Sequence, residues 1–385
     1  MQRKRYFRDA SFGALALTLV LLVLALTLTR LPRLVPAFAA KSDALSRAEE
    51  LLKLRSDLLV KGNPEELARF YLPMESRARW ALEKEAARIH YLREWAPMRR
   101  IEFTRAKIDF TRVSVEAGEK EAGVSISAHT LLSYRHLDRP EAGESTLGWR
   151  TVHWIELTRE GREWLVRAEW YLDPLEAASR NPTVAAAGGE LKGYGQEYGS
   201  AQGDPVTNRG AYRREAAVRY ADRYAGVKVG PGTGRYNQKY RDFTGLGGDC
   251  ANFVSQALAD EEAGSLPQDW NWCYVDGEGS EAWLKAEALV YHLLGTGRAV
   301  SLARGSLAEV VAAREGNTAS ALAALRPGDI IAYEEGGEIQ HVSLVVGWDE
   351  AGYILVNSHS ADRYHVPWDL GYGAETRYWL LAVQG

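Results

Sequence analysis

The chain has 385 residues, ordinary apolar and charged contents, and a net charge of −4. Residues 1–41 carry seven basic residues and one acidic residue, so the rest of the chain has a net charge of −10. A body this acidic is a poor surface for a polyanion, which argues against a nucleic-acid-binding function. Two cysteines, Cys250 and Cys273, exclude a disulfide-rich scaffold but leave a single bridge open.

The amino terminus predicts a membrane-directed segment over residues 1–41. Ala10 to Thr29 is uncharged, rich in Leu, Ala and Val, and long enough to span a bilayer as a helix. Basic residues precede it, as expected for a cytoplasmic start. The alternative is a cleaved signal peptide, because Ala37-Phe38-Ala39 fits a small-x-small cleavage pattern. Both interpretations place the remaining chain outside the cytoplasm.

Residues 42–173 predict an α+β domain with helices first and strands afterwards. Apolar residues recur at helical spacing from Ser42 to about Arg93, with a break before Pro64. After Pro97 the period changes, which favours helices that cover one face of a curved antiparallel sheet, by architectural analogy a cystatin-like roll. The expected strands are 101–103, 108–115, 124–132, 151–157 and 164–170. Residues 174–210 are polar and rich in Gly and Ala, so they are interpreted as a linker.

The third segment, residues 211–385, carries the residues with catalytic potential. Tyr212 to Tyr224 predicts a helix, and Gly247-Gly248-Asp249 precedes an apolar helix that we expect to begin at Cys250. Asp249 is the expected N-cap. The positive end of a helix favours a thiolate, so this position predicts a lowered thiol pKa and a nucleophilic Cys250.

A cysteine nucleophile needs a base from a distant segment. Residues 325–333 predict a turn followed by a strand, and His341 opens the next predicted strand, which forms a hairpin with residues 353–359. Asn357 and His359 point to the same face of an extended strand. Either could hold the imidazole of His341 in the correct tautomer, and Asp362 could brace His359.

Residues 211–385 resemble the bacterial putative amidase domain family, which is related to the NlpC-type and CHAP cell-wall hydrolases of the papain-like group. The resemblance is carried by GGDCANFVSQAL, LRPGDIIAY, HVSLVVGWD and NSHSADR. It implies a papain-like α+β fold and a catalytic set of Cys250, His341, and His359 or Asn357, with His359 favoured because a second histidine is common in the NlpC-type group. The 80 or so residues between the cysteine helix and Leu325 exceed what the fold needs, so specificity is not inherited across them.

The resulting expectation is an extracytoplasmic cysteine amidase or peptidase that acts on amide bonds, with peptidoglycan as the substrate that family and compartment suggest. The backbone N–H of Cys250 would meet the oxyanion, with help from Tyr236 or Tyr240, and the mechanism needs no metal or organic cofactor. The alternative is a non-catalytic wall-binding or assembly module on the same fold. A zinc site of Cys250, His341, His359 and His365 is disfavoured because paired-ligand spacing is absent.

Overall fold

The computed structural model describes residues 38–175, 212–312 and 320–385. The predicted span at residues 10–29 and most of the predicted linker lie outside these ranges. Within the described ranges, no helix combines the length and apolar character needed to cross a bilayer.

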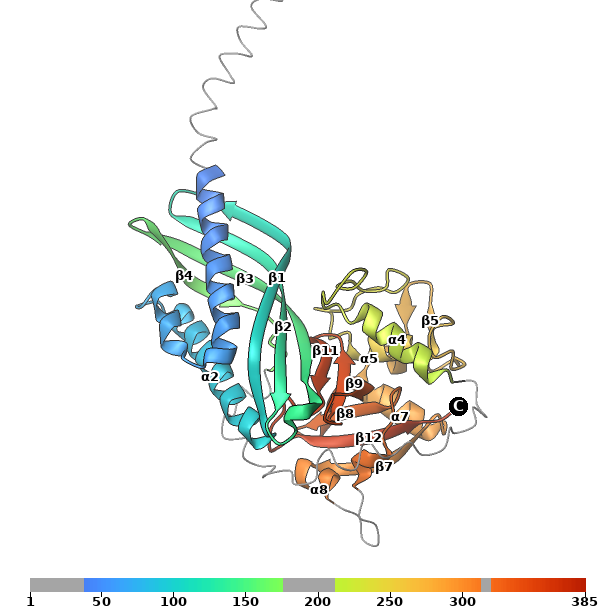
Figure 1. The fold of residues 1–385 in the computed structure, drawn as a ribbon. Coiled ribbons are helices and arrows are strands. Elements are labelled where there is room, and N and C mark those ends of the chain that lie inside the picture. The colour runs from blue at the N-terminus through green and yellow to red at the C-terminus, as the bar shows by residue number, and fades with distance from the viewer. Residues whose placement is uncertain (1–37, 176–211, 313–319) are drawn as a thin grey trace, which may run out of the picture.

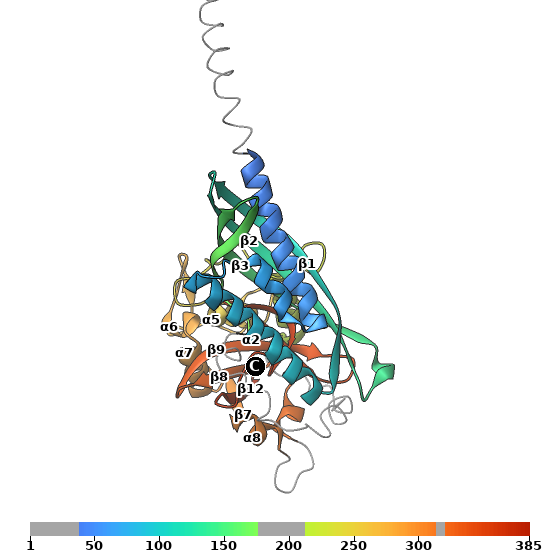
Figure 2. The ribbon, with the colours of Figure 1, turned by 90° about the vertical axis from the view of Figure 1, so that its left-hand side faces the viewer.

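Residues 38–175, here called the accessory region, place helices on one face of an antiparallel sheet (Figures 1 and 2). This mixed α+β order confirms that part of the sequence prediction. The two strands expected between residues 101 and 115 are one strand with a bulge after Phe103. The elements are a helix at residues 38–61, η1 (Pro64–Phe70), α2 (Ser76–Met98), β1 (Ile101–Ala117), β2 (Glu121–His136), η2 (Pro140–Ala142), β3 (Glu144–Glu160) and β4 (Glu163–Trp170).

The C-terminal region, residues 212–385, packs helices against a second run of antiparallel strands. Its helices are α4 (Arg214–Tyr224), α5 (Cys250–Ala259), α6 (Glu281–Leu284), α7 (Ala286–Gly295), α8 (Leu307–Val311) and η4 (Ala321–Ala324). Its strands are β5 (Tyr274–Val275), β6 (Glu278–Gly279), β7 (Ala299–Ser306), β8 (Ile330–Glu335), β9 (Glu338–Trp348), β10 (Ile354–Ser358), β11 (Asp362–Pro367) and β12 (Arg377–Val383). His341 is thus the fourth residue of β9 rather than the first.

The two regions share one sheet. Strand β11 pairs with β3 of the accessory region through Asp362↔Arg150, Arg363↔Trp149 and Tyr364↔Gly148. Within the described residues the strand order is β1-β2-β3-β11-β10-β9-β8-β12-β7, and β4 pairs with β3. The two regions therefore form one continuous sheet rather than two separate domains joined by a linker.

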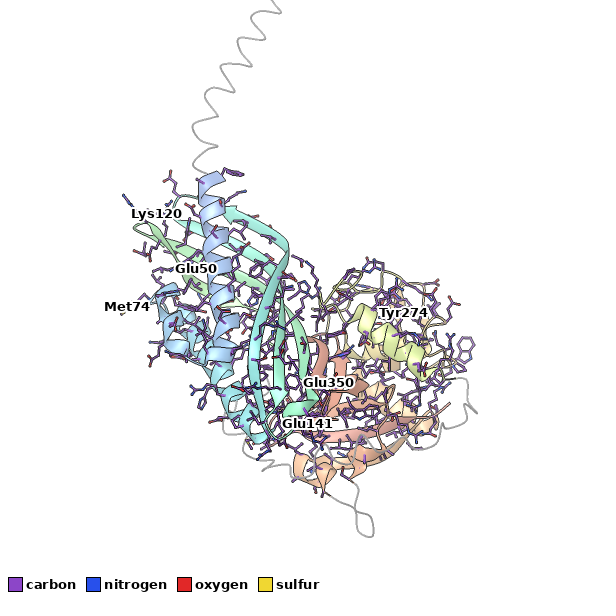
Figure 3. All side chains as sticks on the ribbon, viewed as in Figure 1. Glu50, Met74, Lys120, Glu141, Tyr274 and Glu350 are labelled. Carbon is purple, nitrogen blue, oxygen red and sulfur yellow. The ribbon has the colours of Figure 1, made fainter. Side chains whose placement is uncertain are left out.

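Buried ion pairs reinforce this junction. Arg99 of the accessory region pairs with Asp369 at 2.6 Å, and His136 Nε2 lies 2.7 Å from Asp349 Oδ2. Figure 3 labels Glu350 close to the end of the accessory sheet, where its backbone N–H donates to Ser145 Oγ.

The start of the predicted linker belongs to this junction as well. Pro174 accepts a hydrogen bond from Arg363, and Leu175 is buried in the core of the accessory region. Because both residues pack against folded elements, the boundary of a linker at residue 174 is corrected to a point beyond Leu175.

A buried set of charged residues, here called the paired cluster, lies in the accessory region. Arg55 donates to Glu169 at 2.7 Å and lies 3.6 Å from Glu85, while Arg88 lies 3.4 Å from Asp173. Burial favours a protonated Glu169, but Arg55 and His153 outweigh it and lower the pKa of Glu169 to about 2. Each cation of the cluster thus has a carboxylate partner.

Apolar side chains cover both faces of the C-terminal sheet. Val342, Leu344 and Leu355 join one core with α4, α5 and α7, whereas Val345 and Val356 join a second core on the opposite face. This alternation fixes which way each polar residue of β9 and β10 points.

Candidate active site

Cys250 is the first residue of α5, as the sequence predicts. The loop before it turns sharply at Gly247 and Gly248, whose φ angles are +118° and +113°. L-residues rarely adopt these angles, which explains the two glycines of the motif. The loop is held in place because Ser360 Oγ accepts the backbone N–H of Asp249.

Asp249 does not cap the helix through its side chain, which corrects the sequence expectation. Its carboxylate instead accepts the Phe243 N–H at 3.0 Å and Asn252 Nδ2 at 2.7 Å, and lies 2.7 Å from His359 Nδ1. Asp249 therefore ties three segments together directly beside Cys250.

The thiol of Cys250 is 7% exposed and lies against β9. Burial raises its pKa to about 11, although backbone N–H groups of Val342 and Ala251 favour the thiolate. The neighbouring Asp249 charge raises the pKa further. The lowered thiol pKa expected from the helix position is thus wrong for this structure, because desolvation outweighs the helix terminus.

The thiol contacts the backbone of Val342, the residue that follows His341 in β9. β10 pairs with β9 only as far as Leu344, so the Cys250 thiol meets the edge of β9 beyond the last pair. The predicted nucleophile thus lies against the strand that carries the predicted base, and the catalytic roles of both residues stay predictions.

His341 is half-buried, but its Nε2 atom is buried and has no hydrogen-bond partner among the described residues. Burial, helped by the positive charge of Arg363, lowers the pKa of His341 to about 3. Near neutral pH the thiol and the imidazole are therefore both uncharged.

Asn357 does not lie beside His341, which corrects its predicted orienting role. Asn357 pairs with Leu344 across the β9–β10 ladder, and cross-strand partners share a face. Leu344 is three residues from His341, so the two point to opposite faces. The Asn357 amide donates to Asp222 at 2.9 Å, and its oxygen accepts the His365 N–H at 2.7 Å.

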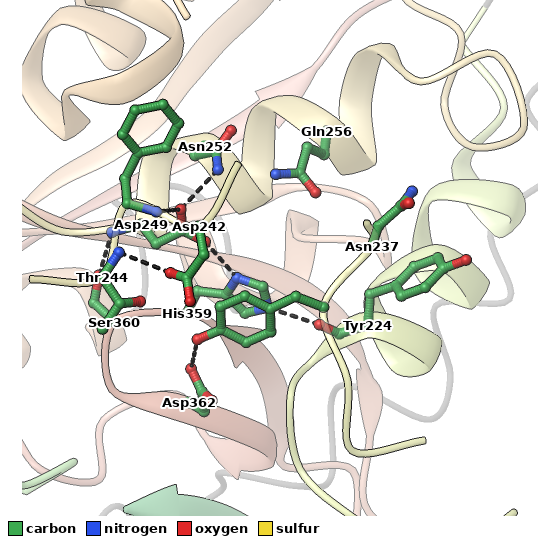
Figure 4. Close-up of polar contacts among 12 residues, drawn as sticks. Tyr224, Asn237, Asp242, Thr244, Asp249, Asn252, Gln256, His359, Ser360 and Asp362 are labelled. Carbon is green, nitrogen blue, oxygen red and sulfur yellow. Dashed lines mark hydrogen bonds and ion pairs between the residues drawn. The ribbon is translucent and has the colours of Figure 1, made fainter. Parts of the chain in front are cut away.

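His359 is also occupied elsewhere. Its side chain is 1% exposed, with Nδ1 2.7 Å from Asp249 and Nε2 2.6 Å from the Tyr224 carbonyl oxygen (Figure 4). Both ring nitrogens of His359 are therefore engaged by oxygen atoms of the protein. The orienting role predicted for His359 is therefore corrected to bracing the loop that carries Cys250.

The two tyrosines expected at the oxyanion are directed away from it. The Tyr236 hydroxyl donates to Asp362 at 2.6 Å, and the ring stacks on His359 at 3.8 Å. The Tyr240 hydroxyl donates to Asp260, the C-cap of α5, at 2.6 Å. That is the opposite end of a ten-residue helix, about 15 Å from Cys250.

Asp362 joins the accessory region to this loop. Its carboxylate lies 2.6 Å from Arg150 of β3 and accepts the Tyr236 hydroxyl. Burial raises the pKa of Asp362 despite the Arg150 charge. Arg150 was not predicted from the sequence, because a lone arginine on a distant strand has no motif to mark it.

A cavity of about 190 Å³ opens beside His341, between the two regions. Tyr333, His341, Arg363 and Tyr372 line it, together with Pro174. Arg363 was also missed as a site residue, although it ends the NSHSADR run, because its role depends on the fold around it.

No group of three or more His, Cys, Asp or Glu side chains within the described ranges is arranged to hold a metal ion. His359 and His365, two ligands of the disfavoured zinc alternative, hydrogen-bond to protein oxygens instead. Both cysteines are free thiols.

Comparison with known families assigns the C-terminal region. Residues 211–381 match the family model described as "Putative amidase domain". This result confirms the resemblance recognised in the sequence. No curated protein matches the chain.

Several solved structures are similar to part of the chain. A putative dehydratase of the NTF2-like family from Streptomyces avermitilis has 11% identity and a TM-score of 0.25, covering 33% of this chain and 94% of its own. The intermembrane-space region of chloroplast protein ARC6 has 17% identity and a TM-score of 0.24, covering 34% and 96%. An NTF-2-like protein of unknown function from Shewanella oneidensis has 12% identity and a TM-score of 0.21, covering 34% and 98%. Scores this low carry no functional inference.

Proposed function

We propose that this chain, whose residues 211–381 match an amidase-domain family, is an extracytoplasmic cysteine amidase or peptidase with Cys250 as nucleophile and His341 as base. The observation that carries the proposal is the position of the Cys250 thiol. Cys250 starts a helix, and its thiol meets the β9 backbone at Val342. The preceding residue is His341, whose Nε2 atom has no hydrogen-bond partner among the described residues. A cysteine at a helix start against a strand that carries a histidine supports the Cys–His arrangement that the resemblance to papain-like hydrolases implies.

In the proposed mechanism the sulfur attacks the carbonyl carbon of an amide while the neutral His341 accepts the thiol proton. A thiol with a pKa of about 11 needs a base at the moment of attack, because little thiolate exists beforehand. The backbone N–H of Cys250, as the first residue of α5, has no partner within the helix and can meet the oxyanion. His341 then returns its proton to the leaving amine, and water hydrolyses the thioester.

No hydrogen bond joins the thiol to His341 in the described structure. Catalytic hydrogen bonds in ligand-free enzymes are often long and tighten on substrate binding. Asn357 and His359 have other hydrogen-bond partners. The proposed catalytic pair is therefore a Cys–His dyad that backbone contacts and packing hold in place. His359, Asp249 and Ser360 act as positioning residues for the nucleophile loop.

Peptidoglycan is the proposed substrate, and a membrane-attached body outside the cytoplasm is the proposed location. The support is the uncharged run from Ala10 to Thr29, the basic residues that precede it, and the relation of the family to cell-wall hydrolases. Removal of this run as a signal peptide would release the same body into the extracytoplasmic space.

The test is digestion of purified peptidoglycan by the protein beginning at residue 38. We expect new amino and carboxyl ends, identified by mass spectrometry, that do not form with the Cys250→Ser variant. Unchanged peptidoglycan together with no cleavage of any soluble stem peptide would contradict the proposal.

A non-catalytic wall-binding module is the second candidate. It is favoured by the raised pKa of Cys250 and by the missing thiol–imidazole hydrogen bond. Sedimentation with peptidoglycan that is equal for wild type and Cys250→Ser, without any new ends, would support this candidate instead.

A further inference from the structure

Arg363 is a buried cation that has no carboxylate partner among the described residues. Its side chain is 3% exposed, and its two terminal nitrogens donate to the backbone carbonyl oxygens of Leu370, at 3.0 Å, and Pro174. The Nε atom is buried and has no hydrogen-bond partner among the described residues. Two of its five N–H donors are therefore used.

An uncompensated buried charge is costly, and proteins normally pair it. The junction shows the usual solution, since Arg99 and Arg150 each lie 2.6 Å from an aspartate. Arg363 differs from them because only neutral carbonyl groups accept its hydrogen bonds.

The carboxylates of the same cavity have other partners. Asp173 pairs with Arg88 at 3.4 Å, and Glu335 accepts a hydrogen bond from Thr376 at 3.4 Å. Neither forms an ion pair with Arg363 within the part of the chain that the structure describes. The cavity therefore presents a cation that its own walls do not neutralise.

The Arg363 guanidinium lies near the proposed catalytic residues. Arg363 and His341 line the same cavity, and the guanidinium packs over the Tyr372 ring at 4.9 Å from its centroid. The charges of both Arg363 and Cys250 act on the Tyr372 hydroxyl, so both groups lie near this residue.

We propose that Arg363 binds a carboxylate of the substrate and thereby selects amides that carry a free carboxylate beside the scissile bond. A guanidinium matches this group because its N–H donors form a planar fork that fits two carboxylate oxygens. The inference rests on the proposed function of Cys250 and His341 and adds the substrate class.

Binding of a substrate carboxylate to Arg363 would also change the pKa of His341, the proposed base. Arg363 contributes to the low pKa of His341, after burial. A bound carboxylate would offset the Arg363 charge and raise the pKa of His341, which makes it a stronger base only when the correct substrate is present.

The test compares two alkylating reagents of similar size, anionic iodoacetate and neutral iodoacetamide. Each reacts with the sulfur by displacing iodide, and mass spectrometry of tryptic peptides follows Cys250 and Cys273 separately in the same sample. Reaction at pH 9 keeps His341 neutral. We expect the iodoacetate-to-iodoacetamide rate ratio at Cys250 to exceed that at Cys273 by about tenfold, because Arg363 attracts the anion.

Variants assign this preference to Arg363. In Arg363→Gln the ratio at Cys250 should fall to that at Cys273, whereas Arg363→Lys should keep most of it. Arg304→Gln is the matched control, since Arg304 lies on the same sheet, pairs with Glu334 and does not line the cavity. Its ratio should equal that of wild type. Because both reagents sample the same thiolate, the ratio is insensitive to changes in the thiol pKa.

Two results would overturn the inference in different ways. If Cys250 is alkylated readily but has the same iodoacetate-to-iodoacetamide rate ratio as Cys273, Arg363 does not attract the anion. The proposed cysteine mechanism would be unaffected by that result. A Cys250 that no reagent modifies in the folded protein would remove both. If Arg363→Gln fails to fold, the wild-type ratio and Arg363→Lys still decide between these results.

A substrate pair gives the second readout. A short peptide with a free carboxylate beside the cleaved amide should have a KM about tenfold below that of the same peptide with this group amidated. Arg363→Gln should abolish this difference. Equal KM values for the two peptides with the wild-type protein would contradict the assignment.

Discussion

Two regions of the molecule bury charge in opposite ways. In the accessory region the paired cluster joins Arg55 and Arg88 to the carboxylates of Glu169, Glu85 and Asp173. In the cavity of the C-terminal region, Arg363 lacks a carboxylate and His341 Nε2 lacks any partner among the described residues. An unpaired cation and an unpartnered imidazole nitrogen that line the same cavity point to a site organised for a ligand.

The strongest test of this comparison replaces one arginine of each kind. Arg55→Met leaves Glu169 and Glu85 buried without their cation, which should lower the free energy of unfolding by about 3–5 kcal/mol. Arg363→Met removes a charge that has no counter-ion in the described ranges. The loss of its two hydrogen bonds to carbonyl groups is therefore offset by the desolvation cost that the substitution relieves. We expect a change within about 1 kcal/mol for Arg363→Met.

Urea unfolding of both variants at pH 7 measures the difference. If Arg363→Met lowers the free energy of unfolding as much as Arg55→Met does, Arg363 serves to stabilise the contact between the two regions. That result would contradict the predicted difference in stability between removing a paired and an unpaired buried charge.

The second prediction concerns His359, which is fully partnered although it lies near the site. His359→Ala removes the partner of Asp249 Oδ2 and of the Tyr224 carbonyl oxygen, so the free energy of unfolding should fall by about 2–3 kcal/mol together with kcat. His359→Gln should recover part of both.

An orienting residue of a triad would behave differently. If His359→Ala lowers kcat by orders of magnitude while the urea midpoint stays unchanged, His359 acts on His341 directly, and the reassignment to the nucleophile loop is wrong.

The third prediction concerns how the free energy of unfolding changes at acidic pH. His341 has a folded-state pKa of about 3 against 6.5 in the unfolded chain, so the unfolded state binds more protons between these values. Stability that is fully present above pH 6.5 is therefore lost as the pH falls, by up to about 1 kcal/mol per pH unit. Glu169 acts in the same direction but in a lower window, below its unfolded value of 4.5.

The difference between wild type and His341→Asn isolates this contribution. Urea titrations at pH 7, 6 and 5 should show wild type losing stability faster than the variant as the pH falls. Parallel curves would mean that His341 titrates normally in the folded protein and is more open to water than its surroundings imply.

Part of this site could be predicted from the sequence alone. The Gly-Gly-Asp-Cys run fixes the start of α5, because only glycines suit the left-handed turn before it and an apolar face follows it. The strands around His341 and Asn357 were likewise visible as apolar alternation. These features depend on residues close together in the chain.

The remainder depends on how distant segments meet. The β9–β10 register decides that Asn357 and His341 face opposite ways, and no local pattern encodes that register. Pairing between β11 and β3, which brings Arg150 to Asp362, is equally invisible in either segment alone. The helix-terminus argument for a reactive thiol failed because burial, which the sequence does not report, dominates the pKa of Cys250.

The central claim is that Cys250 performs covalent catalysis, and the matched cysteine variants test it most directly. Hydrolysis of peptidoglycan or of a soluble stem peptide should fall by at least about 10⁴-fold in Cys250→Ala, with the circular-dichroism spectrum unchanged. Cys273→Ala, which removes the other free thiol, should keep wild-type activity. A folded Cys250→Ala protein that still cleaves the substrate would contradict the account.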